Sequence, residues 1–298
     1  MVDNIVEHSV IVVDAPPRRR AGNGRLRHLT KVWRNKPAFL SMVVLVVVGL
    51  LSVVAPVLPI PGPNTRDLRV RLLPPSMEHP FGTDHQGRDV LSRTLHGGRI
   101  SITVSLVAVL LAAVVGGVLG LLSGFFTSVD NLIMRLTDVQ LSFPSIMLAI
   151  AIVAAIGPSI VNLVIVLAVS GWVDYARVVR AEVLSLRERD FSEAARALGC
   201  SEARIAFRHI LPNVTTSIVI LATLQAARFM LQEAGLSFLG LGVPPDVASW
   251  GGMLSEAQQQ IFIAWWPALF PGLAISIIVL SINIFGDWLG EALDSRAN

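Results

Sequence analysis

The sequence predicts an all-α integral membrane protein with six transmembrane helices and both termini in the cytoplasm. Hydrophobic residues make up 53% of the 298 residues and charged residues only 15%, whereas a soluble domain carries about a quarter charged residues. The mean hydropathy is +0.65. Aromatic residues make up only 6% of the chain, which favours helices over an outer-membrane barrel with its aromatic girdles.

Six apolar stretches are long enough to cross a bilayer, because a helix needs about 20 apolar residues to span the hydrocarbon core. The first stretch is longer than the apolar part of a signal peptide, so we expect it to remain uncleaved. Gly116, Gly117 and Gly120 predict close helix packing in the second stretch, and Pro144 predicts a bend in the third. The predicted spans are residues 38–58, 100–122, 138–156, 160–179, 214–232 and 263–284.

The distribution of positive charge predicts the orientation, because arginine and lysine accumulate in cytoplasmic loops. The leader up to Lys36 holds eight Arg or Lys, residues 177–208 hold seven Arg, and residues 235–266 hold none. Residues 180–212 are therefore expected in the cytoplasm and loops 59–99 and 235–262 outside. We expect a disordered basic tail over residues 1–24, an interfacial helix over 25–37 and a transmembrane domain over 38–298.

The loop 59–99 does not fit the charge rule, since it would lie outside and yet carries six Arg. Four acidic residues in the loop offset part of this charge: Asp67, Glu78, Asp84 and Asp89. An alternative with five spans would place the loop in the cytoplasm, but one of the six long apolar stretches would then not cross the membrane. The six-span arrangement is preferred.

Charged residues occur within the predicted spans, where each needs a partner or water. Arg135 and Asp138 lie three residues apart, as do Asp174 and Arg177, and each couple is expected to form a local pair or to reach the membrane boundary. Arg228 lies in the outer half of the fifth span. It either lines an aqueous pathway or pairs locally with Glu233 or Gln232. The pathway candidates are therefore Arg228, Gln232 and Glu233.

Sequence signatures of catalysis are missing. The chain has no Walker A loop, no GxSxG, no HExxH and no CxxC. His79, Asp84 and His85 lack the spacing of metal ligands, and the single cysteine, Cys200, excludes an internal disulfide. We expect no catalytic residue, no metal site, no cofactor bound by this chain and no nucleic-acid partner.

A polar stretch from Asp190 to Pro212 predicts two short amphipathic helices on either side of Gly199. Asp190 and Glu193 are spaced as a capping box for the first helix. The apolar residues share one face on each helix: Phe191, Ala194, Ala195 and Leu198 on the first, and Ala203, Ala206, Phe207 and Ile210 on the second. Two such helices outside the membrane must dock on a partner.

This stretch resembles the EAA motif of ABC importer permeases, in Glu193-Ala194-Ala195, Gly199 and Ile210-Leu211-Pro212. Other stretches resemble the second ("C"-type) permease of the dipeptide, oligopeptide and nickel importers, and the resemblance covers about residues 28–295. These stretches are 79–84, 87–93, 233–242, Pro244-Pro245, 249–251 and the tail residues Asn283, Gly286-Asp287 and Leu293-Asp294. One departure is Gly290-Glu291, where the family commonly has a basic residue.

The resemblance implies a type I ABC importer permease fold in the bacterial cell membrane and a non-catalytic transport subunit. Its partners would be a second homologous permease, cytoplasmic ATPase subunits that bind ATP and Mg, and an extracellular substrate-binding protein, periplasmic or lipid-anchored. The residues expected to couple to the ATPase are Asp190, Glu193, Ala194, Ala195, Leu198, Gly199 and Pro212. The residues expected at the outer gate or binding-protein contact are Asp84, Arg88, Asp89, Arg93, Pro244, Pro245 and Trp250.

Dipeptides and oligopeptides are the expected cargo, with haem, nickel or another peptide-like cargo as the alternative within the same architecture. A stand-alone secondary transporter or channel would need no ATPase, and co-purification separates it from an importer subunit. An intramembrane enzyme is disfavoured, because the spans contain no paired nucleophile and base and no two-carboxylate motif.

Overall fold

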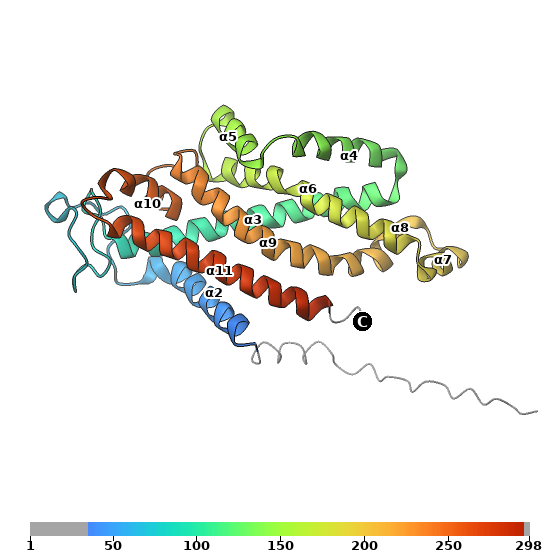
Figure 1. Cartoon of the computed structure of the whole chain (residues 1–298), viewed down its shortest axis with the longest axis horizontal. Helices are drawn as coiled ribbons and strands as arrows, with labels where there is room; N and C mark the ends of the chain where they lie inside the picture. Colours follow the sequence, from blue (N-terminus) through green and yellow to red (C-terminus); the bar gives the residue numbers. More distant parts are fainter. Residues whose placement is uncertain (1–34, 295–298) are drawn as a thin grey trace, which may run out of the picture.

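The computed structural model of the chain describes residues 35–294 (Figure 1). The predicted tail 1–24 and most of the predicted interfacial helix 25–37 lie outside this range. In chain order the helical elements are α2 (Lys36–Val54), η2 (Ala55–Val57), η3 (Leu68–Val70), α3 (Val90–Phe125), α4 (Thr127–Leu141), α5 (Ser145–Ile156), α6 (Ile160–Arg187), α7 (Asp190–Ala197), α8 (Glu202–Ile205), η4 (Ala206–Ile210), α9 (Leu211–Phe238), α10 (Trp250–Ala257), η5 (Gln258–Gln260) and α11 (Trp266–Asp294).

The prediction of an all-α membrane protein is confirmed. Five helical runs are long and apolar enough to cross a membrane, and α4 with α5 forms a sixth, bent candidate. The two halves of this candidate meet at 91° across residues 142–144, so the predicted bend at Pro144 is confirmed. The bent candidate begins at Thr127, earlier than the predicted span 138–156, and its break falls where Pro144 cannot donate the backbone hydrogen bond that would continue the helix.

Several helices extend beyond their predicted spans. α3 begins at Val90 rather than at residue 100. Asp89 caps this start by accepting a hydrogen bond from the backbone amide of Ser92. α6 runs on to Arg187 and so continues into residues 180–212, the segment predicted to be cytoplasmic. Hydropathy marks the apolar part of a helix, and the polar turns that continue it escape detection.

The centre of the bundle is the contact between α3 and α6. Gly116, Gly120 and Gly124 recur at every fourth residue and face α6, where a Cβ on Gly116 would lie 2.2 Å from the carbonyl oxygen of Trp172. Small residues at this spacing allow two membrane helices to approach closely. The predicted packing role is confirmed for Gly116 and Gly120. A Cβ on Gly117 would instead lie 3.5 Å from the side chain of Ile218, which is an ordinary contact distance.

The two ends of the long axis carry different polar structures (Figure 1). One end carries α7 and α8; residues 188–201, which include α7, are called the α7 segment below. The opposite end carries residues 59–89 together with α10 and η5, called the α10 layer below. α2 runs toward the α10 layer and α11 runs away from it (Figure 1). The start of α2 and the end of α11 therefore both point away from the α10 layer, as an even number of crossings requires.

Candidate functional site

The α7 segment is a short helix presented on two long ones. It leaves α6 after Arg187 and returns through α8 and the π-helical turn η4 into α9, without a break between Glu202 and Phe238. Ser192 donates a hydrogen bond to the carbonyl of Leu186 at 2.8 Å, and Arg196 donates to Glu202 at 2.8 Å and to the carbonyl of Arg187 at 3.1 Å. These contacts fix α7 to the end of α6 and to α8, which continues into α9.

The faces of α7 differ from the predicted ones. Ser192 and Ala195 are buried against the bundle, and Phe191, Glu193 and Ala194 are exposed. Leu198 is 85% exposed, although it is apolar. Of the residues predicted to couple, Glu193, Ala194 and Leu198 therefore lie on an open face, whereas Ala195 faces inward.

Two predictions about local geometry have opposite outcomes. The capping box is wrong, because Arg189 precedes the helix, no side chain caps it and Asp190 is already its first residue. The turn at Gly199 is confirmed, since its φ is +81°, where glycine is favoured over other residues. Pro212 lies in the first turn of α9, where its missing N–H is tolerated.

The apolar face predicted for the second short helix is also wrong in part. Ile205, Ala206 and Ile210 are buried, but Phe207 is 62% exposed and Ala203 is exposed. The cause is the π-helical turn over Ala206–Ile210, which adds a residue to the turn and shifts the register of the buried face. A 3.6-residue period cannot reveal such a turn.

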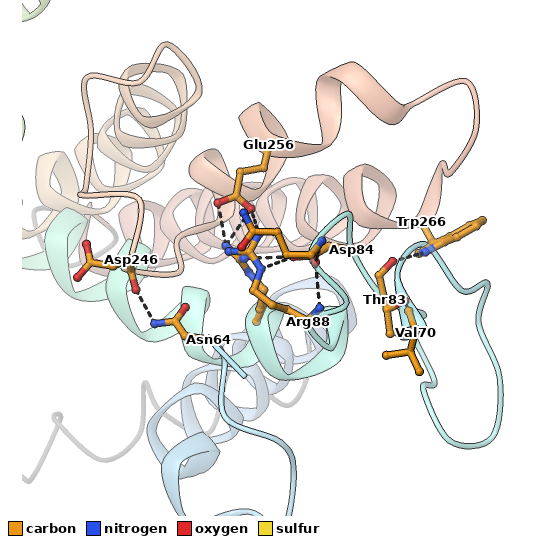
Figure 2. Close-up of polar contacts among 10 residues, drawn as sticks. Asn64, Val70, Thr83, Asp84, Arg88, Asp246, Glu256 and Trp266 are labelled. Carbon is orange, nitrogen blue, oxygen red and sulfur yellow. Dashed lines mark hydrogen bonds and ion pairs between the residues drawn. The ribbon is translucent and has the colours of Figure 1, made fainter. Parts of the chain in front are cut away.

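The α10 layer is built around four charged side chains, three of them buried and the fourth, Glu256, half-buried (Figure 2). Arg88 pairs through Nε with Asp84 Oδ2 at 2.5 Å, and through Nη2 with Glu256. Arg93 pairs with the same two carboxylates at 3.1 Å each. Two cations thus meet two anions, and the pairs join residues 84–93 to α10.

Burial and positive charge act on Glu256 in opposite directions. Desolvation raises the pKa of its carboxyl group, and the neighbouring Arg88 offsets part of this rise. Asp84, His85 and Glu256 are also close enough together to hold a cation. However, Arg88 and Arg93 already engage both carboxylates, so the cluster is an ion-pair network.

Further contacts complete the α10 layer. His79 Nδ1 lies 2.9 Å from Asp89 Oδ2, Trp266 donates to the carbonyl of Thr83 at 2.9 Å, and Asn64 donates to the carbonyl of Asp246 at 2.6 Å (Figure 2). Gly87 has a φ of +72° and lies so close to residue 67 that a Cβ would be 1.7 Å from its carbonyl oxygen. The layer is therefore held by charge, by hydrogen bonds and by close backbone contact.

Burial leaves most residues predicted at the outer gate or binding-protein contact without an open surface in this conformation. Asp84, Arg88 and Arg93 are at most 5% exposed, and the same is true of Asp89 and Trp250. They stabilise the layer from inside, and their role at an outer gate stays a prediction. Of the seven predicted residues, only Pro244 and Pro245 reach the surface.

The charged residues within the spans pair between helices, not within them. Asp138 on α4 pairs with Arg177 on α6, and Asp174 on α6 pairs with Arg228 on α9 at 3.2 Å. The predicted local couples Arg135–Asp138, Asp174–Arg177 and Arg228–Glu233 are therefore wrong. Interhelical pairs depend on how helices dock, and sequence spacing does not contain that information.

The interhelical pairs belong to a polar strip over α4, α5, α6 and α9. Gln140 accepts a hydrogen bond from Trp172 Nε1 at 2.8 Å, and Gln232 donates to Ser145 at 3.3 Å. We call the strip the polar seam; its members are Asp138, Gln140, Asp174, Arg177, Arg228 and Gln232. Exposing a charge to lipid costs about 2.5–3.5 kcal/mol on insertion scales, so the seam needs water or a polar partner.

Glu233 does not belong to the seam, although it was predicted beside Arg228 as a pathway residue. It is fully buried, and it accepts a hydrogen bond from Ser237 at 2.8 Å. In this conformation it reaches no surface of the chain. Glu256 and Asp174, which the structure places in the two charge clusters, were not among the predicted site residues.

Comparison with known families gives two matches. Residues 116–298 match the family described as binding-protein-dependent transport system inner membrane component. Residues 29–75 match the N-terminal TM domain of oligopeptide transport permease C.

Named relatives cover nearly the whole chain. A protein of Brucella abortus biovar 1, whose name describes a peptide transport system permease protein, is 41% identical over 266 residues, which are 89% of this chain and 90% of the relative. The dipeptide transport system permease protein DppC of Alkalihalophilus pseudofirmus is 42% identical over 264 residues, 88% of this chain and 87% of the relative.

A solved structure shares the fold. A chain in an inward-facing structure of the MetNI methionine ABC transporter superposes with a TM-score of 0.55 and 18% identity, covering 68% of this chain and 96% of that one. At this identity the likeness concerns the arrangement of helices alone. It confirms the predicted ABC importer permease fold.

Proposed function

Because the chain belongs to the family of binding-protein-dependent transport system inner membrane components, we propose that it is the C-type permease subunit of an ABC importer for dipeptides or oligopeptides. The relatives named for peptide and dipeptide transport support this cargo class, and they come from bacteria. The subunit would lie in the bacterial cell membrane, form half of the pathway with a second permease and perform no catalysis itself.

The observation that carries the proposal is the open face of α7. Glu193, Ala194 and Leu198 lie exposed on a helix that is bonded to the end of α6 and to α8, which continues into α9. Phe191, Ala194 and Leu198 expose apolar surface together on this short helix, which suits contact with another protein. We propose that a cytoplasmic ATPase subunit, which binds the ATP and Mg, seats α7 and moves both long helices with it.

The opposite end would receive the extracellular substrate-binding protein. Pro244 and Pro245 remain candidates for this contact because they reach the surface, together with the exposed part of residues 59–81. The buried charges below would keep this surface in one shape while the α7 end moves.

The test is ATP-driven peptide uptake by the assembled importer in proteoliposomes. Glu193→Arg reverses a charge on the open face, and Gly199→Val places a branched side chain where φ is +81°. Both variants should insert normally and lose ATP-coupled uptake. Glu291→Arg, the same charge change on an exposed residue of α11, is the matched control and should transport normally.

Normal uptake by both α7 variants would contradict the coupling role. Peptide uptake by the purified chain without any ATPase subunit would favour a stand-alone transporter. Uptake of haem or nickel but not of peptides by the wild-type importer would retain the architecture and replace the cargo.

A further inference from the structure

Charged side chains are distributed unevenly over the spans. Residues 37–57 of α2 and η2, 100–125 of α3 and 266–286 of α11 contain no Asp, Glu, Lys or Arg. By contrast, α4, α6 and α9 carry the two ion pairs of the polar seam, although α6 and α9 are apolar enough to cross the membrane and α4 forms a bent candidate together with α5. The seam therefore marks the face that lipid does not cover.

One pair of the seam lies away from the ends of its helices. Asp174 is near the middle of α6 (Ile160–Arg187), and Arg228 lies in the second half of α9 (Leu211–Phe238). At about 1.5 Å per residue, Asp174 is roughly 20 Å from either end of its helix. A solute that crosses along the seam would meet this pair between the two ends of the bundle.

The two side chains are held but remain accessible. The side chain of Arg228 is 68% exposed and that of Asp174 is 38% exposed. Gln225, which is 1% exposed, donates a hydrogen bond to Asp174 Oδ2 at 2.7 Å, and Arg228 Nη1 lies 3.2 Å from the same oxygen. The buried amide thus orients the carboxylate, while the guanidinium group keeps donors that this contact does not use.

We propose that Asp174 and Arg228 select cargo by binding the two charged ends of a short peptide, a role that rests on the proposed function. Arg228 takes the α-carboxylate and Asp174 takes the α-ammonium group. The pair and the zwitterion are each neutral overall, so the exchange of partners leaves no charge unpaired. A peptide with one blocked end leaves either Asp174 or Arg228 without the charged partner that it had before the peptide bound, which is costly.

The test is uptake of three dipeptides by the whole importer with its binding protein, in proteoliposomes. One dipeptide has free ends, one is N-acetylated and one is C-amidated. For each dipeptide, the uptake rate of the variant is divided by that of the wild type. The preference of the binding protein cancels in this ratio, because the binding protein is unchanged. Arg228→Gln and Asp174→Asn remove one charge each at nearly constant size.

The two variants should give opposite patterns. Arg228→Gln should lower uptake of the free and the N-acetylated dipeptides at least about tenfold and that of the C-amidated dipeptide much less. Asp174→Asn should lower uptake of the free and the C-amidated dipeptides and spare the N-acetylated one. Arg177→Gln, which breaks the other pair of the seam, is the matched control and should affect all three dipeptides by the same factor.

Equal losses for all three dipeptides in both variants, or no loss, would overturn the proposal. If the Gln and Asn variants fail to assemble, Arg228→Lys serves instead, because lysine keeps the charge but cannot donate two parallel hydrogen bonds to a carboxylate. The ratio of free to C-amidated dipeptide uptake should then be smaller in Arg228→Lys than in the wild type. An unchanged ratio there would assign the pair a purely structural role. If the wild type imports no peptide at all, the proposed function fails, and not merely this site.

Discussion

The α7 segment and the α10 layer are both polar structures at the ends of the same helices, but they are built in opposite ways. The α10 layer buries a network of opposite charges beneath its exposed surface, with Arg88 and Arg93 each at most 2% exposed. In the α7 segment, the ion pair that Arg196 forms with Glu202 is exposed, and so is the apolar residue Leu198. One end therefore satisfies part of its charge internally, whereas the other leaves its charges and an apolar side chain accessible, as the proposed contact with an ATPase subunit requires.

The largest effect is expected from Arg88→Met, which removes the cation shared by Asp84 and Glu256. Removing one partner from a buried ion pair costs about 3–5 kcal/mol, and here the removal leaves Arg93 as the one cation that pairs with both carboxylates. Thermal unfolding of the purified complex, followed by intrinsic tryptophan fluorescence, measures the loss. Arg66→Met changes an exposed arginine of the same segment and should leave the transition unchanged. Equal stability of the two variants would break the contrast between the ends.

A smaller and more discriminating test makes the same substitution at both ends. Gly87→Ala meets both a φ of +72° and a backbone carbonyl oxygen 1.7 Å from the new Cβ, so about 3 kcal/mol of destabilisation is expected. Gly199→Ala meets a φ of +81° but no atom within 4 Å, and the expected cost is about 1–2 kcal/mol. Thermal unfolding of the two variants gives the difference directly. A larger loss at Gly199 would show that the α7 segment is the more constrained end.

The smallest effect on stability is expected from Leu198→Ser. The side chain is 85% exposed, so unfolding should shift by less than about 0.5 kcal/mol. Binding of the ATPase subunit to the detergent-solubilised permease should nevertheless weaken, which a titration of the two purified components measures. Unchanged affinity would remove Leu198 from the interface and would leave Glu193 and Ala194 as its candidates.

The fold could be predicted from the sequence because the membrane imposes length and hydropathy on each crossing. The turn at Gly199 was also predictable, since only a local backbone requirement is involved. The pairing of charges was not, because Glu256 meets Arg88 across 168 residues and Arg228 meets Asp174 across 54. A local pattern contains no signal for partners that only helix docking brings together.

The same limit explains why the loop 59–99 departs from the charge rule. It carries six Arg, but Arg88 and Arg93 are neutralised by Asp84 and Glu256 inside the α10 layer. Counting arginines treats every one as a free cation beside the membrane. Two of these six are parts of the folded interior.

The separation of Arg93 and Glu256 by 163 residues also has a consequence during synthesis. At about 5–20 residues per second, a ribosome needs roughly 10–30 s to add the glutamate after the arginine has emerged. Throughout this interval Asp84 is the only acid of the four-charge cluster available to both guanidinium groups. The first helices therefore enter the bilayer with a surplus of positive charge on one flank, and this surplus disappears only when the last third of the polypeptide arrives.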